Sequence, residues 1–234
     1  MTKVEVTTVD GVLIIDKPSG MTSHDVVQRV KDLIGAKKVG HLGTLDPAAT
    51  GVLPLVINGA TKHAARLAGV EKIYEFTLKL GVSTETDDDT GKLRQEFKVP
   101  ADAADKLKEI LPQFEGRIMQ KPPAFSAVKI RGKRAYKLAR RGEAVDPDKR
   151  PVHVDNISIL DTYIPDIKMK LECKSGTYVR SICRDIGEMM GCGGHASGIR
   201  RLRSGSYTID NAVSLDEIEK NPDILNQKLI PVED

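Results

Sequence analysis

The first residue of chemical interest is an aspartate in a glycine-rich loop. Asp46 closes the stretch Gly-His-Leu-Gly-Thr-Leu-Asp and is followed by Pro47. Proline restricts the preceding residue to extended conformations, and Gly43 and Gly51 let the chain bend closely around the carboxylate. Asp46 is therefore a candidate nucleophile held in a defined direction. The alternative is an aspartate that organises a turn by accepting hydrogen bonds from nearby backbone N–H groups.

Arg180 is a second candidate because of its place in the expected helix over residues 178–190. It falls in the first turn, where a cation opposes the helix dipole. This placement indicates a partner elsewhere in the fold, and a buried or half-buried carboxylate such as Asp46 would suit, since ion pairing keeps the acid ionised. A surface arginine that reaches solvent is the alternative.

Tyr74 and His41 could also take part in a site. Tyr74 lies on the apolar face of the strand expected over residues 72–80, so the pattern by itself predicts a core tyrosine. His41 could be a general base, a stacking group or a hydrogen-bonding loop residue. No conventional catalytic triad is evident, and residues 59–62 lack the full spacing of a phosphate-binding P-loop.

Hydrophobic periodicity and turn residues predict the elements that position these side chains. Strands outnumber helices and do not alternate with them regularly, so we expect an α+β fold with a mixed, largely antiparallel sheet flanked by helices. The expected strands cover residues 11–17, 51–57, 72–80, 152–160 and 167–173, and the expected helices residues 22–35, 60–68, 102–111 (stopped by Pro112), 178–190 and a short one after Ser214.

Length and composition bound the class of protein. The 234 residues suit a single domain over 1–234, and the odd count of three cysteines, without a Cys-x-x-Cys pair or zinc-type spacing, predicts neither disulfides nor a structural metal. No leader pattern and no apolar run of membrane-spanning length occurs. We therefore expect a soluble, cytoplasmic protein.

The net charge of +3 is unevenly distributed. Residues 117–150 contain eleven Lys and Arg against three acidic residues, and Arg200, Arg201 and Arg203 form a second basic cluster. The basic segment over 117–150 reads as an insertion on the domain. It is either an ordinary solvated face or the electrostatic footprint of a polyanionic partner.

Five separated motifs, in the right order, resemble the TruB family of tRNA pseudouridine-55 synthases. The resemblance covers nearly the whole chain. The motifs are residues 13–23, which resemble the family's opening motif; 40–51, its catalytic loop; 72–74, its tyrosine strand; 175–181, its arginine motif; and 191–195 with Leu202 and Arg203, its distal segment.

The resemblance implies a pseudouridine synthase fold and gives the candidate residues their roles. It implies that Asp46 is the nucleophile, that Arg180 pairs with it and that Tyr74 packs on the target uracil. His41 would wedge into the T-loop of tRNA, and the basic segment would close over the RNA. The residues expected to bind RNA or to line or brace the pocket are His41, Lys17, Lys62, Tyr178, Arg140, Arg141 and Arg201.

The implied reaction is isomerisation of uridine to pseudouridine at position 55 of tRNA, by a monomer without metal or cofactor. The target base would be flipped out of its loop into the pocket. Two departures stand out: position 42 is Leu where the family more often has Thr, and the chain ends at Asp234, so we expect a C-terminal RNA-binding PUA-type domain to be absent or much reduced.

Two competing functions remain open from the sequence alone. One is an RNA-binding or tRNA-folding protein that keeps the scaffold without turnover. The other is a carboxylate-based hydrolase of small molecules, which needs a second acid near Asp46. No obvious second acid is spaced for that role.

Overall fold

The computed structural model describes residues 10–130, 132–139 and 141–232, which form two compact units. The described residues up to Ile73 and from Arg200 onward form the first, here called the terminal unit, and Tyr74–Ile199 form the second, the central unit. Strands β4 (Glu71–Leu80) and β12 (Gly194–Ser204) contribute residues to both units. Each unit is described by itself.

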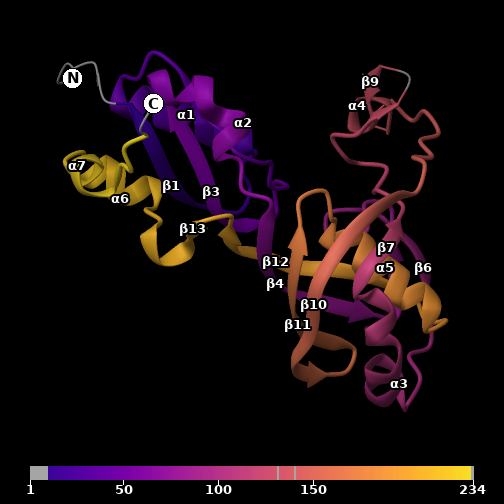
Figure 1. Ribbon diagram of the computed structural model, residues 1–234. Coiled ribbons are helices and arrows are strands. Elements are labelled where there is room, and N and C mark those ends of the chain that lie inside the picture. The colour runs from indigo at the N-terminus through magenta and orange to yellow at the C-terminus, as the bar shows by residue number, and fades with distance from the viewer. Residues whose placement is uncertain (1–9, 131, 140, 233–234) are drawn as a thin grey trace. The chain divides into compact units, whose positions relative to one another are not determined.

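The terminal unit is built on strand β3. β1 and β2 both pair with β3 in antiparallel fashion, whereas β12 pairs with it in parallel, with Arg201 opposite Gly51. Helices α6 and α7 lie near β1 (Figure 1). The elements are β1 (Gly11–Lys17), α1 (Ser23–Ile34), β2 (Val39–His41), β3 (Thr50–Ile57), the 3₁₀ helix η1 (Asn58–His63), α2 (Ala64–Leu67), β13 (Tyr207–Thr208), η3 (Ile209–Asn211), α6 (Leu215–Lys220) and α7 (Ile224–Lys228).

Helix α1 has the ends that the sequence predicts. Thr22 caps the first turn through a capping box with Asp25, and Gly35 ends the helix in the left-handed conformation at φ 62°. Val26, Val27 and further apolar residues at helical spacing are buried. The helix therefore fixes the chain that leads from β1 toward the loop of Asp46.

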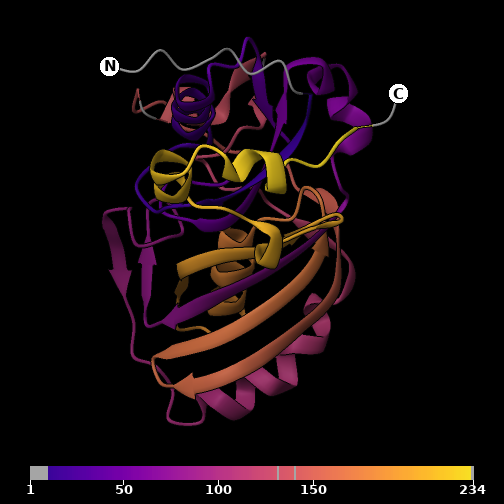
Figure 2. The same ribbon diagram turned by 90° about the vertical axis from the view of Figure 1, so that its left-hand side faces the viewer.

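The central unit is a sheet in the order β12-β4-β11-β10-β7, with helices α3 and α5 on one face (Figures 1 and 2). β10 pairs with both β11 and β7 in antiparallel fashion. Its elements are β5 (Val82–Thr84), β6 (Leu93–Glu96), α3 (Ala103–Ile110), η2 (Leu111–Phe114), β7 (Gly116–Gln120), β8 (Lys129–Ile130), β9 (Lys133–Arg134), α4 (Ala135–Ala139), β10 (Arg150–Tyr163), β11 (Asp166–Lys174) and α5 (Val179–Met189), with β4 and β12 as given above.

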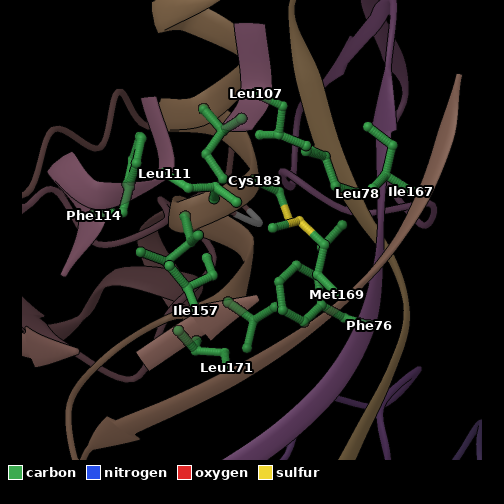
Figure 3. Packing of buried hydrophobic residues seen from close by; sticks show 14 of the residues in the cluster. Phe76, Leu78, Leu107, Leu111, Phe114, Ile157, Ile167, Met169, Leu171 and Cys183 are labelled. Atoms are coloured by element: carbon green, nitrogen blue, oxygen red, sulfur yellow. The ribbon is translucent and has the colours of Figure 1, made fainter. Parts of the chain in front are cut away.

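The core of the central unit joins this sheet face to the two helices. Along β4 the side chains of Phe76, Leu78 and Leu80 are buried at every second position, as the alternating sequence predicts. Figure 3 shows Phe76 and Leu78 of this strand packed with Met169 of β11 and Cys183 of α5. This packing holds the first turn of α5, which carries Arg180, in a fixed place.

The mixed, largely antiparallel sheet confirms the expected α+β class. The expected helix over 102–111 ends before Pro112 as predicted, since α3 ends at Ile110 and Pro112 lies in the 3₁₀ helix η2 that follows. Two other local features differ from the expectations. The expected helix over 60–68 is a 3₁₀ helix followed by one α-turn. Strand β12 was not expected from its glycine-rich sequence. That the whole chain is a single domain stays a prediction.

All three cysteines are buried free thiols. Among the described residues, no helix is long and apolar enough to cross a membrane.

Candidate active site

The backbone is anchored on both sides of Asp46. The carbonyl of Leu45 accepts a hydrogen bond from the Ser23 hydroxyl at 3.1 Å, and the same hydroxyl accepts the N–H of Leu45 at 2.9 Å. On the other side, the carbonyl of Pro47 accepts the N–H of Gly20 at 2.9 Å. The Asp46 side chain is half-buried. The surrounding chain therefore holds the backbone of Asp46 in place, as expected for a candidate nucleophile.

Lys17 adds a third anchor to this loop. Its side chain is completely buried, and Nζ donates to the carbonyl oxygens of Pro18 at 2.7 Å, Met21 at 2.6 Å and Pro47 at 3.0 Å. Burial lowers the pKa of Lys17 to about 8, while the charge of Asp46 opposes that shift. Lys17 therefore braces the loop through its ammonium group, one of the two roles that the family resemblance implies for it.

Arg201 contacts the same loop on both sides of Asp46 in the sequence. Its side chain is 1% exposed, and its guanidinium donates to the carbonyls of Val52 at 2.7 Å, Gly43 at 3.3 Å and Thr44 at 3.4 Å. A guanidinium buried in this way has no free face for a phosphate. These contacts favour a positioning role for Arg201 over the RNA contact expected from its sequence.

Gly51 is required where the loop rejoins β3. Its φ is +98°, and an added Cβ would lie 2.2 Å from the carbonyl oxygen of Arg201. The parallel pairing of β12 with β3 places the two backbones this close. Next to this contact, Arg200 makes a bidentate ion pair with Asp16, at 3.1 and 2.7 Å. At least two arginines of the 200–203 cluster, Arg200 and Arg201, thus make contacts within the protein.

His41 and Lys62 lie on separate elements of the terminal unit. His41 ends β2 and is half-buried, and burial lowers the pKa of its imidazole, with the charge of Arg201 acting in the same direction. The ring is therefore neutral near pH 7 and suited to stacking. Lys62 is exposed on η1.

In the central unit, Arg180 is a buried residue of the first turn of α5. Its guanidinium donates to the carbonyl of Thr86 at 2.9 Å and to that of Phe125 at 3.0 Å, and its Nε lies 3.7 Å from a carboxylate oxygen of Asp88. The position of this cation in the first turn, which the helix dipole disfavours, thus correctly indicated an arginine with partners elsewhere in the fold. Pairing between Arg180 and Asp46 stays a prediction.

Asp88 belongs to a segment for which the sequence pattern predicts only a turn. This acidic turn, residues 85–91, also contains Asp87, whose φ is +60° and whose carboxylate pairs with Arg184 at 2.9 Å. Burial raises the pKa of Asp87, and the charge of Arg184 opposes that shift. The run of acids next to glycine could have been read as a partner for buried arginines, since ionised carboxylates are rarely buried alone.

Tyr74 and Tyr178 are both half-buried. Tyr74 packs at the edge of the central core on β4, so the structure gives it the core contact that its strand position predicts. The backbone of Tyr178 exchanges two hydrogen bonds with the Gln120 amide, at 2.8 and 3.1 Å, and Arg150 lies over its ring at 5.1 Å. Tyr178 is thereby fixed at the start of α5.

The described cations of the basic segment are exposed or half-buried. Arg141 is exposed, like most of the other described Lys and Arg residues in 117–150. Arg140 lies outside the described residues. Exposure of these cations leaves them available to a polyanion.

Comparison with known proteins places this geometry in a family. The family model for the N-terminal domain of TruB family pseudouridylate synthases matches residues 31–179, and the model for the tRNA pseudouridylate synthase B C-terminal domain matches residues 180–234. The chain therefore belongs to the TruB family of pseudouridylate synthases. The resemblance and the fold expected from the sequence are both confirmed.

Individual relatives agree with this placement. The chain is similar to tRNA pseudouridine synthase B of Corynebacterium diphtheriae (44% identity over 92% of this chain and 74% of the relative) and of Solibacter usitatus (46% over 90% and 72%). The solved structure of a Cbf5-Nop10-Gar1 complex matches with a TM-score of 0.71 and 30% identity, over 93% of this chain and 56% of that chain. This chain thus spans a little over half the length of that protein.

We predict that Arg201→Met lowers the free energy of unfolding by about 1–3 kcal/mol, because buried carbonyl oxygens lose their donor. Urea denaturation measures the change, and Arg66→Met, at an exposed position of α2, is the control for loss of one positive charge. Equal stability of the two variants would contradict the bracing role of Arg201.

Proposed function

We propose that this chain converts uridine to pseudouridine in the T-loop of tRNA, at position 55, with Asp46 as the nucleophile. The observation that carries the proposal is the anchoring of the Asp46 backbone through Leu45 and Pro47. Membership of the TruB family and relatives named tRNA pseudouridine synthase B support the same activity.

The reaction breaks the bond between C1′ and N1, turns the detached uracil and joins C5 to C1′. A carboxylate can serve by adding to the base, by adding to C1′ or by removing a sugar proton on a glycal path. All three routes require an ionised carboxylate in a fixed position, because a misplaced group loses much of its effect. The anchors around Asp46 meet that requirement.

Arg180 and Tyr74 complete the proposed set of catalytic residues. Arg180 is buried and holds a permanent positive charge, so pairing with Asp46 would keep the acid ionised. Tyr74 would present its ring to the flipped uracil, since aromatic faces stack on unpaired bases. Both roles come from the family resemblance.

In this proposal, RNA is bound by His41 and by side chains on the surface of the protein. His41, neutral because burial lowers its pKa, would enter the space that the flipped base leaves. Lys62, Tyr178 and the basic segment with Arg141 would bind the T-arm. We further propose that the protein acts as a monomer, in the cytoplasm, without metal or cofactor.

We predict that Asp46→Asn abolishes pseudouridine formation on a T-arm transcript while RNA affinity changes less than about threefold, since the amide keeps the shape but cannot act as a nucleophile. Mass spectrometry of the modified transcript and filter binding give the two quantities. Asp210→Asn, at an exposed position of η3, is the matched control. Turnover by Asp46→Asn would refute the mechanism, and a wild-type chain that binds the transcript without modifying it would favour the RNA-folding function instead.

Lys17 gives a prediction about pH. Its pKa in the folded chain, about 8, is below the ordinary value of 10.5, so above pH 8 the amine has one donor fewer for its three carbonyl acceptors. We expect the single-turnover rate to fall along an alkaline limb near pH 8. Between pH 8 and 10.5 the unfolded chain binds more protons at Lys17, so this residue's contribution to stability rises with pH, and the loss of activity is not unfolding.

The variant Lys17→Arg separates this effect from other titrations. Arginine keeps its charge throughout this range, so the limb near pH 8 is expected to disappear. Its persistence in a folded Lys17→Arg protein would assign the limb to another group.

For the basic segment, we predict that reversing the charges of Arg140 and Arg141 to Glu flattens the dependence of log affinity on log salt concentration. The slope should fall by about 1 for each phosphate that the protein no longer neutralises, because fewer counterions are released. Reversal of Lys98 and Lys168, which are exposed outside the basic segment, is the control. An unchanged slope in the Arg140 and Arg141 variant would place the phosphate contacts elsewhere.

A further inference from the structure

The acidic turn contains a third carboxylate with a partner of its own. Asp87 and Asp88 face arginines of α5, whereas Asp89 lies 3.0 Å from Nε2 of His195 on β12. The other ring nitrogen of His195, Nδ1, lies 3.0 Å from the carbonyl oxygen of Val82. Both nitrogens of this imidazole therefore face oxygen atoms.

Both of these oxygen atoms can accept a hydrogen bond from the ring. A backbone carbonyl only accepts, and so does an ionised carboxylate, so an imidazolium, with a proton on each nitrogen, is the form of His195 that would donate to both. The His195 side chain is 4% exposed and that of Asp89 48% exposed, so the carboxylate end of this contact lies at the surface.

His195 is connected to Arg180 through the acidic turn. Beside His195, the N–H of Ala196 donates to the carbonyl of Asp87 at 3.0 Å, and Ala196 bridges Asp88 in parallel fashion. The same turn offers the Thr86 carbonyl and the Asp88 carboxylate to Arg180. The turn thus contacts both β12 and the arginine that the proposed mechanism uses.

We propose that His195 is a positioning residue for the isomerisation: as an imidazolium bound to Asp89, it holds the acidic turn in the place that orients Arg180. This inference rests on the proposed function. The turn needs such support, because Asp87 has a positive φ, a conformation that costs energy for a residue other than glycine. The neighbouring aspartates of the turn, Asp87 and Asp88, are already engaged with Arg184 and Arg180.

The first test is a double-mutant cycle with Asp89→Asn, His195→Gln and the double variant. Each single change is expected to lower the single-turnover rate constant about tenfold, with RNA affinity within about twofold of wild type. The double variant is expected to be no slower than the slower single variant, because both changes break one interaction. Asp161→Asn, an exposed aspartate on β10, is the matched control.

Each outcome of the cycle has a defined meaning. Additive losses, or an unchanged rate in the half-exposed Asp89→Asn variant, would overturn the inference while wild-type turnover leaves the proposed function standing. Loss of rate, affinity and thermal stability together in Asp89→Asn would also overturn it, since that pattern is structural. Absence of turnover in the wild type would instead refute the proposed function, and the ring can then still be examined directly.

That direct measurement is a long-range ¹H–¹⁵N spectrum of the histidine side chains at pH 7, with His195 assigned by its loss in His195→Gln. We expect two protonated ring nitrogens in the wild type and a shift toward a neutral ring in Asp89→Asn. A neutral tautomer of His195 in the wild type would overturn the imidazolium, whatever the state of the reaction.

Discussion

The arrangement around Asp46 depends on burying positive charge against backbone carbonyl groups. A cation removed from water is tolerated only when its donors are satisfied, and Lys17 has three carbonyl acceptors within 3.0 Å. Arg201 likewise binds carbonyls on both arms of the loop. Since these carbonyls come from segments far apart in the sequence, the two cations define the path of the loop, and the direction of the Asp46 side chain follows from that path.

In the central unit, arginines are stabilised by side-chain carboxylates as well as by backbone carbonyls. Arg180 and Arg184 are held by the acidic turn, in which consecutive acids are assigned to different cations. A guanidinium offers five donors in a fixed plane, so a carbonyl and a carboxylate together can fix its orientation better than either alone. The charge of Arg180, which the proposed mechanism uses, is therefore kept in place by a carboxylate and a carbonyl of the acidic turn.

Elements with a repeating local pattern of apolar residues were predicted from the sequence, whereas contacts between residues far apart in the sequence were missed. Periodicity identified β4 and α5, because alternation and helical spacing are local signals, and the capping residues Thr22 and Gly35 gave the ends of α1 correctly. Strand β12 was missed because its pairing with β3 is a long-range contact that glycines at its start conceal. The partners of Arg180 were missed for the same reason, since no spacing links position 88 to position 180.

Arg201 shows how a charge count can mislead about RNA binding. In the sequence it looks equivalent to Arg141, yet one is buried with bound carbonyls and the other is exposed. A phosphate can displace water from an exposed cation at little cost, but drawing Arg201 outward would leave buried carbonyls without donors. Counterion release is therefore expected only from exposed cations such as Arg141 of the basic segment, while the buried Arg201 and Lys17 shape the loop that the RNA would meet in the proposed function.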